Sequence, residues 1–330
     1  MRQILRIARL TAVGAAAALL TTVPSSGQSL VETAWPERTV RLIVPLPPGS
    51  PTDISARRLA ERLAERWRQP VIVENRQGAD GIPAVSAFIG ARDNHTLLFS
   101  FAGIITINPL LYDKLPYDPA KDLVPIAPVL DNFIGIAATA SLNVSSVADL
   151  VRSARAQPGK LNWSALPGIP NYLFVALLKN AELDTVRIGY RDFAPAYQDL
   201  HQGRLQVVVA GIPNLLAHQE AATARLLMVS SRQRSPQAPD VPTAAEAGFP
   251  DLTFDATIGL YGWRDIPASL VARIAADVRA IADNAVFREQ LVTTGVAPRT
   301  STPAEFAAAI EEQRAKIAAV HMSMTAKPAQ

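Results

Sequence analysis

The chain has 330 residues, of which 49% are hydrophobic and 18% are charged, and its formal net charge is +3 at pH 7. This length suffices for two domains with sizeable cores, and the composition is that of a globular protein rather than a disordered one. The sequence contains no cysteine, which excludes disulfides, thiolate metal sites, cysteine nucleophiles and a cysteine-linked lipid anchor.

The first 34 residues have the pattern of a secretory signal peptide. Arg2, Arg6 and Arg9 form a basic start, an apolar run covers residues 10–23, and Pro24 with small residues follows. The run is too short to span a bilayer comfortably, and no later stretch has the roughly 18 uninterrupted apolar residues of a membrane helix. We therefore expect this segment to direct the chain to the periplasm and to be removed; a buried amphipathic helix is the alternative.

Cleavage before residue 35 would also change the charge. It removes three arginines and one glutamate, so the formal net charge falls from +3 to about +1. A near-neutral chain offers no electrostatic attraction for nucleic acid, so no nucleic-acid partner is expected.

Short apolar runs alternate with helical patterns along the rest of the chain. The runs that predict strands cover residues 40–45, 71–74, 96–101, 134–139, 161–165, 186–190, 205–210, 226–230 and 258–261. Helical patterns occur after Thr52 or Asp53, at 147–156, 172–179, around Phe193 to Leu200, at 268–284 and at 303–319. Strands and helices in this order predict an α/β fold in two units, with helices packed on the sheets.

No arrangement typical of an enzyme is visible. The four histidines lack metal-binding spacing, and no nucleophile elbow is present. Residues 48–51 resemble a phosphate loop only superficially, because the Lys-Ser/Thr pair of such a loop is missing. We therefore predict no catalytic residue, no metal and no cofactor.

Two segments instead suit the binding of a small anion. Residues 46–53 and 165–171 each join a predicted strand to a predicted helix and carry few charges. Unpaired N–H groups at the positive end of a helix dipole can hold a carboxylate without an arginine. Residues 100–103 also follow a strand, where ligands of α/β sheets usually bind. For each segment alone an ordinary turn is the alternative, and for Asp53 a helix cap is favoured over contact with a ligand.

Six segments resemble motifs of the tripartite tricarboxylate transporter solute receptors, also called the Bug family. They are VRLIVPLPPGSPTD (40–53), PVIVENRQGADG (70–81), INPLLYDKLPYDPAKDLVPIAPV (107–129), QPGKLNW (157–163), YRDFAPAYQDLHQGRL (190–205) and PDVPTAAEAGFP (239–250). The resemblance covers nearly the whole chain after the predicted signal segment, in the order of the family.

The resemblance implies a two-lobed periplasmic-binding-protein type II (Venus flytrap) fold, each lobe a mostly parallel sheet flanked by helices. Residues 35–130 and 252–330 would form lobe 1, and residues 131–251 lobe 2. The chain would capture a small organic carboxylate for the membrane permease subunits of a tripartite tricarboxylate-type transporter, and we expect it to be a monomer. An orphan receptor that presents its ligand to a membrane signalling sensor is the alternative, and an enzyme on the same fold is a weaker one.

Carried over by position, the resemblance also implies ligand contacts from both lobes. These are Leu46, Pro48, Gly49, Ser50, Asp53, Ser100, Ala102, Ala165, Pro167, Gly168, Tyr190 and Gly211. The family's Phe-Asp-Asn segment reads Val209-Ala210-Gly211 in this chain, so an acidic partner for a ligand amine is absent. We therefore expect a ligand without a free amine, and a pocket that is more apolar than is usual for the family.

Overall fold

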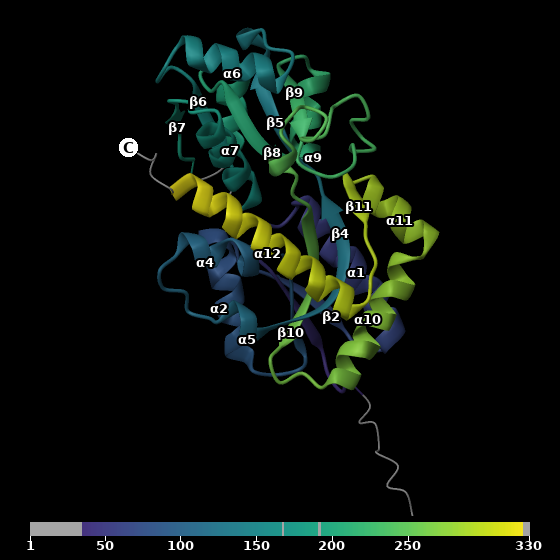
Figure 1. Cartoon of the computed structure of the whole chain (residues 1–330). Coiled ribbons are helices and arrows are strands. Elements are labelled where there is room, and N and C mark those ends of the chain that lie inside the picture. Colours follow the sequence, from purple (N-terminus) through teal and green to yellow (C-terminus); the bar gives the residue numbers. More distant parts are fainter. Residues whose placement is uncertain (1–34, 167, 191–192, 326–330) are drawn as a thin grey trace, which may run out of the picture. The chain divides into compact units, whose positions relative to one another are not determined.

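The computed structural model describes residues 35–166, 168–190 and 193–325 (Figure 1). The predicted signal segment and Pro167 lie outside these residues. Within the described ranges, every helix is too short or too polar to cross a membrane.

Six strands form the first sheet, in the order β11-β4-β10-β3-β1-β2. β1 pairs in parallel with β2 and β3, whereas the pairings of β10 with β3 and β4, and of β11 with β4, are antiparallel. The strands are β1 (Val40–Val44), β2 (Val71–Asn75), β3 (Thr96–Phe101), β4 (Leu123–Asn132), β10 (Ala256–Trp263) and β11 (Val296–Pro298).

Helices from both ends of the chain accompany this sheet. α1 is amphipathic and buries Leu59, Leu63 and Trp67, whereas Ile54, which its apolar pattern also predicts to face inward, is only half-buried. α12 contacts α3 and β4, and it also contacts α7, which packs on the second sheet (Figure 1). The helices are α1 (Pro51–Trp67), η1 (Ala79–Gly81), α2 (Ile82–Ala91), α3 (Gly103–Thr106), α4 (Asn108–Leu111), α5 (Pro119–Asp122), α10 (Ala268–Ala282), α11 (Ala285–Val292) and α12 (Pro303–Thr325).

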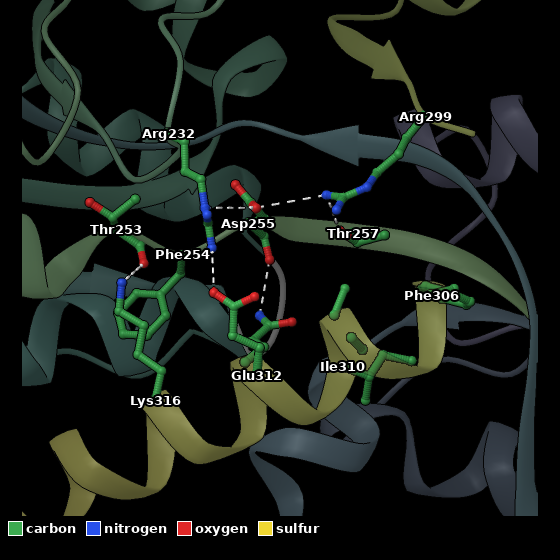
Figure 2. Close-up of a pocket in the computed structure, with 13 residues that line it drawn as sticks. Arg232, Thr253, Phe254, Asp255, Thr257, Arg299, Phe306, Ile310, Glu312 and Lys316 are labelled. Atoms are coloured by element: carbon green, nitrogen blue, oxygen red, sulfur yellow. Dashed lines mark hydrogen bonds and ion pairs between the residues drawn. The ribbon is translucent and has the colours of Figure 1, made fainter. Parts of the chain in front are cut away.

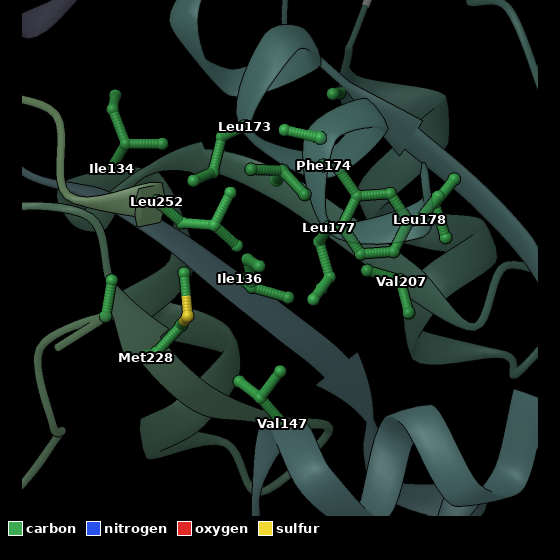
Figure 3. Packing of buried hydrophobic residues seen from close by; sticks show 14 of the residues in the cluster. Ile134, Ile136, Val147, Leu173, Phe174, Leu177, Leu178, Val207, Met228 and Leu252 are labelled. Atoms are coloured by element: carbon green, nitrogen blue, oxygen red, sulfur yellow. The ribbon is translucent and has the colours of Figure 1, made fainter. Parts of the chain in front are cut away.

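Five strands form the second sheet, in the order β7-β6-β8-β5-β9. They are β5 (Ile134–Thr139), β6 (Asn162–Ala165), β7 (Val186–Arg187), β8 (Val207–Gly211) and β9 (Ala224–Val229). The associated helices are η2 (Ala140–Leu142), α6 (Val147–Ala156), α7 (Ile169–Asn180), α8 (Ala194–His201), α9 (Ile212–Glu220) and η3 (Pro250–Leu252). Figure 3 shows the core between sheet and helices, where Ile136 and Val207 of the strands meet Phe174 and Leu177 of α7.

The two-sheet α/β architecture is confirmed, but the expectation of mostly parallel sheets is wrong, because both sheets are mixed. In the second sheet β6 runs parallel to β7 and β8, whereas β5 is antiparallel to β8 and β9. The reason lies in the connections: β4 leaves the first sheet and continues through Phe133 into β5, and β10 brings the chain back. A strand that leaves a sheet and the neighbouring strand that returns to it run in opposite directions. The lobe boundaries near residues 130 and 251 stay a prediction.

Candidate functional site

The loop after β1 is held in shape by the first turn of α1. Ser50 is the N-cap, because its hydroxyl accepts a hydrogen bond of 3.2 Å from the Asp53 amide. The expectation that Thr52 or Asp53 caps this helix is therefore wrong by two to three residues. Pro48 and Gly49 are exposed and Leu46 is half-buried. The φ of Gly49 is +81°, a conformation that favours glycine at the tip of this loop.

Asp53 lies beneath this loop with only 1% of its surface exposed. Its carboxylate accepts hydrogen bonds from the Gly49 amide at 2.8 Å, from Asn75 at 2.8 Å and from Arg57 at 3.0 Å. Burial alone would raise the pKa of this carboxyl, but the bonds from Arg57, Asn75 and Gly49 outweigh it and hold the pKa below its usual value. The geometry therefore gives Asp53 a role in shaping the loop, and its contact with a ligand stays a prediction.

The end of β3 contributes a buried hydroxyl without a partner. Ser100 is fully buried, and among the described residues no atom forms a hydrogen bond with its Oγ. Ala102 is also buried, and its amide donates to the Thr257 carbonyl at 3.1 Å. A buried hydroxyl that lacks a partner costs about 1–3 kcal/mol and calls for a specific explanation, such as a ligand atom that completes the bond.

The remaining candidates lie where strands of the second sheet end. Ala165 ends β6, Gly211 ends β8, and Gly168 precedes α7 with a φ of +79°. The Tyr190 hydroxyl donates to Asp199 at 2.6 Å, and burial together with this bond raises the pKa of Tyr190 to about 12. The tyrosine is therefore an uncharged donor that is already engaged.

Two of the predicted loops meet at a side chain that the sequence did not single out. Phe101 ends β3, and a methyl carbon placed on Gly168 would lie 3.9 Å from its ring. A methyl carbon on Gly81 would lie 3.4 Å from the same ring and 3.3 Å from Pro45, which opens the loop before α1. Phe101 thus brings the end of β3 against the residue that precedes α7. Only the three-dimensional contacts show this, because an apolar residue at a strand end has no distinctive sequence signal.

Two buried amide oxygens without partners also lie at this end of the strands. They belong to Asn132 and Asn171, and neither forms a hydrogen bond with a described residue. Asn132 ends β4, and its side chain lies 3.3 Å from the Cβ position of Gly211. Asn171 is in the first turn of α7. The sequence offered one signal for each, namely a polar residue at the edge of an apolar segment.

A pocket of about 210 Å³ lies beside these loops, between β10 and α12 (Figure 2). Of the predicted ligand residues within the described ranges, only Ala102 lines it. Its two arginines pair with acidic side chains: Arg232 contacts Glu312 at 2.8 Å and Asp255 at 3.5 Å, and Arg299 contacts Asp255 at 3.7 Å. The pocket is lined by Ala102, Arg232, Thr253, Phe254, Asp255, Thr257, Arg299, Phe306, Ala309, Ile310, Glu312, Gln313 and Lys316.

The described residues were also compared with the ligand sets of metal sites. No three histidine or acidic side chains among the described residues gather closely enough to hold an ion. His218 stacks on Tyr197 with ring centroids 4.9 Å apart, which accounts for its position without a ligating role.

Comparisons with known proteins place the chain among solute receptors. A profile of the family described as "Tripartite tricarboxylate transporter family receptor" matches residues 55–324. Protein BugT of Bordetella pertussis is 29% identical over 274 residues, which cover 82% of this chain and 84% of BugT.

Two solved structures extend the likeness to the fold. Rhodopseudomonas palustris Rpa4515 with adipate is 29% identical, with a TM-score of 0.80, and the match covers 88% of this chain and 98% of that one. MatC (Rpa3494) of the same organism, with bound malate, is 26% identical, with a TM-score of 0.77 and coverages of 87% and 100%.

The predicted family is thereby confirmed, as is the prediction that the chain is not an enzyme, because the family consists of periplasmic solute receptors. The chain belongs to the tripartite tricarboxylate transporter receptor family.

Proposed function

We propose that this chain binds a small organic carboxylate between the loop before α1, the end of β3 and the loop before α7. The single observation that carries the proposal is the meeting of the β3 end with the α7 start, where the Phe101 ring lies beside Gly168. Without such a contact, each loop would be explained as an ordinary turn.

The chemistry of these segments suits an anion. α1 has 17 residues and α7 has 12, so each directs the positive end of a helix dipole toward its N-terminal loop. The Asp53 carboxylate is occupied by Arg57, Asn75 and the Gly49 amide, so its charge is largely compensated. Ser100 can donate a further hydrogen bond from its buried hydroxyl. Adipate and malate are bound by two similar proteins, which supports a carboxylic acid as the ligand class.

The same segments favour an acid without an amine. The β8 end reads Val209-Ala210-Gly211, and all three residues are buried. It offers no acidic partner for an ammonium group. We therefore propose a carboxylate without a free amine, and micromolar binding of aspartate or glutamate would contradict this part of the proposal.

In the cell, the chain would be exported and would act together with membrane proteins. We propose that residues 1–34 direct export, that residues 35–130 with 252–330 and residues 131–251 form the two lobes, and that the mature chain acts as a monomer. It would deliver its ligand to the permease subunits of a tripartite tricarboxylate-type transporter. A receptor for a membrane sensor would need the same binding site, so this alternative stays a prediction that the identity of the membrane partner decides.

A thermal-unfolding screen of residues 35–330 tests the proposed function. The panel contains mono-, di- and tricarboxylates, aromatic acids and amino acids, added to protein refolded from denaturant to remove co-purified ligand. A ligand at 100 times its dissociation constant adds about 2.7 kcal/mol and raises the melting temperature by several degrees. A shift with one class of acids is expected. Folded protein that responds to no acid would overturn the proposal.

A further inference from the structure

The ring of Phe101 fills a space that three glycines leave open. Methyl carbons placed on Gly103, Gly81 and Gly168 would lie 3.1, 3.4 and 3.9 Å from its atoms. These glycines come from three different segments: α3, the end of η1 and the residue before α7. Because none of them carries a side chain, the ring is the bulkiest group at their meeting point, and it is only half-buried.

A hydrogen-bond network fixes the segments on both sides of the ring. The Tyr112 hydroxyl donates to the Asp80 carboxylate in η1 at 2.5 Å, and Asn108 donates to the Asp80 carbonyl at 3.0 Å. Asn108 also donates to the Tyr117 hydroxyl at 3.0 Å, which in turn donates to the Ile104 carbonyl of α3 at 2.9 Å. η1 and α3 are thus joined through one buried amide, and the ring between them is held in place.

The bond to Asp80 raises the pKa of Tyr112 to about 12, and burial raises that of Tyr117 to about 12. Both phenols therefore remain protonated donors throughout the neutral range.

We propose that Phe101 is a specificity-determining residue, whose ring limits how long an acid the two loops can enclose. The inference rests on the proposed function, because it concerns the body of the same ligand. Its predicted neighbours Ser100 and Ala102 flank it in the chain, and Gly168 lies on its other side. On this proposal, an acid held between the end of β3 and the start of α7 lies against the ring, and its carbon chain extends only as far as the ring allows.

The test is isothermal titration calorimetry with straight-chain α,ω-dicarboxylates of four to eight carbons. It compares the wild-type chain with Phe101→Ala and Phe101→Leu. One methylene in an apolar pocket changes affinity by about 10-fold or more. We expect the ratio of the eight-carbon to the four-carbon dissociation constant to fall at least about tenfold in Phe101→Ala, with Phe101→Leu in between.

Phe249→Ala is the matched control, because Phe249 is also half-buried and packs in the core of the second sheet. It should leave the length profile unchanged. If Phe101→Ala fails to fold, Phe101→Leu alone decides the question. Folded variants that bind the acids as tightly as the wild-type chain, with the same dependence on chain length, would overturn the inference and leave the proposed function intact. A wild-type chain that binds none of the acids in this series or in the thermal screen would overturn both.

Discussion

At the scale of single residues, the binding loops depend on polar groups whose partners decide their roles. Asp53 and Ser100 are both almost fully buried, yet the carboxylate has at least three partners, whereas the hydroxyl has none among the described residues. A satisfied buried group stabilises the fold, and an unsatisfied one costs stability. The first group therefore shapes the loop, and the second is available for a ligand.

The substitution Asp53→Asn tests the first role. The folded-state pKa of Asp53 is lowered, so the charged form stabilises the fold above the ordinary pKa of about 4 and loses this effect as the pH falls through the lowered value. We expect a loss of about 2 kcal/mol in the free energy of unfolding at pH 7. Urea denaturation between pH 7 and pH 3 should show that the difference in the free energy of unfolding between Asp53→Asn and the wild type becomes smaller as the pH falls. The exposed Asp113 supplies the control, and an equal loss in Asp113→Asn would refute the assignment.

Ser100→Ala and Ser230→Ala form a pair that tests the second role. Both serines are fully buried, but Ser230 donates to the Phe254 carbonyl at 3.0 Å. Ser230→Ala should lower the free energy of unfolding by about 1 kcal/mol, whereas Ser100→Ala should leave it unchanged or raise it. The affinity for the acid found in the thermal screen should fall about tenfold only in Ser100→Ala, since one hydrogen bond to a charged group is lost. Unchanged affinity would remove Ser100 from the site.

At the scale of elements, β4 shows why a strand escaped prediction. Its sequence contains Pro125 and Pro128, and proline within an apolar run argues against a strand. In the structure β11 pairs only with Leu130–Asn132, so both prolines lie where β4 has β10 as its sole partner. The ladder with β10 shifts register at both prolines, and such bulges remove the need for the missing N–H group.

The packing of α12 on β10 gives a prediction at this scale. A methyl group on Gly259 would lie 2.6 Å from the Ala127 carbonyl oxygen and 2.6 Å from the Phe306 ring. Gly259→Ala should cost about 3 kcal/mol in the free energy of unfolding by chemical denaturation. Adding Phe306→Ala should not restore the lost stability, because the Ala127 carbonyl oxygen stays in place. Gly90→Ala is the control: Gly90 lies in α2 with open space around it, so alanine should stabilise by up to about 1 kcal/mol.

At the scale of the whole molecule, an ion-pair network joins segments that are distant in sequence. Arg299 follows β11 and contacts Asp131 of β4 at 3.0 Å. It also contacts Thr257 of β10 at 3.0 Å and Asp255 at 3.7 Å (Figure 2). Arg232, which follows β9 of the second sheet, contacts the same Asp255. The network thus surrounds the strands that connect the two sheets.

Arg299→Met tests this network. Burial raises the pKa of Asp131, and Arg299 opposes the rise. A raised folded-state pKa means that stability is lost as the pH rises through it. Without Arg299 the pKa of Asp131 rises further, so the variant should lose about 2 kcal/mol of the free energy of unfolding at pH 7. The loss is smaller than for a fully buried ion pair, because the two side chains are 27–30% exposed. The deficit measured by urea denaturation should shrink towards pH 4. Arg299→Met/Asp131→Asn should recover part of it, and no recovery would contradict the pairing.

The sequence by itself determined most of what is local. The spacing of apolar residues predicted α6 at its observed bounds and most strands within a few residues, because periodicity and caps act over one or two turns. It also determined the family, since the motifs follow the chain order. It also placed the candidate loops correctly at the ends of strands, namely after β1, β3 and β6.

Tertiary structure alone decided what depends on distant residues. It made both sheets mixed, gave Asp53 its partners, and brought Phe101 against Gly168. It also paired Arg299 with Asp131 across 168 positions of the chain. Such contacts are set by the packing of whole sheets and helices, and the local sequence around either partner carries no trace of them.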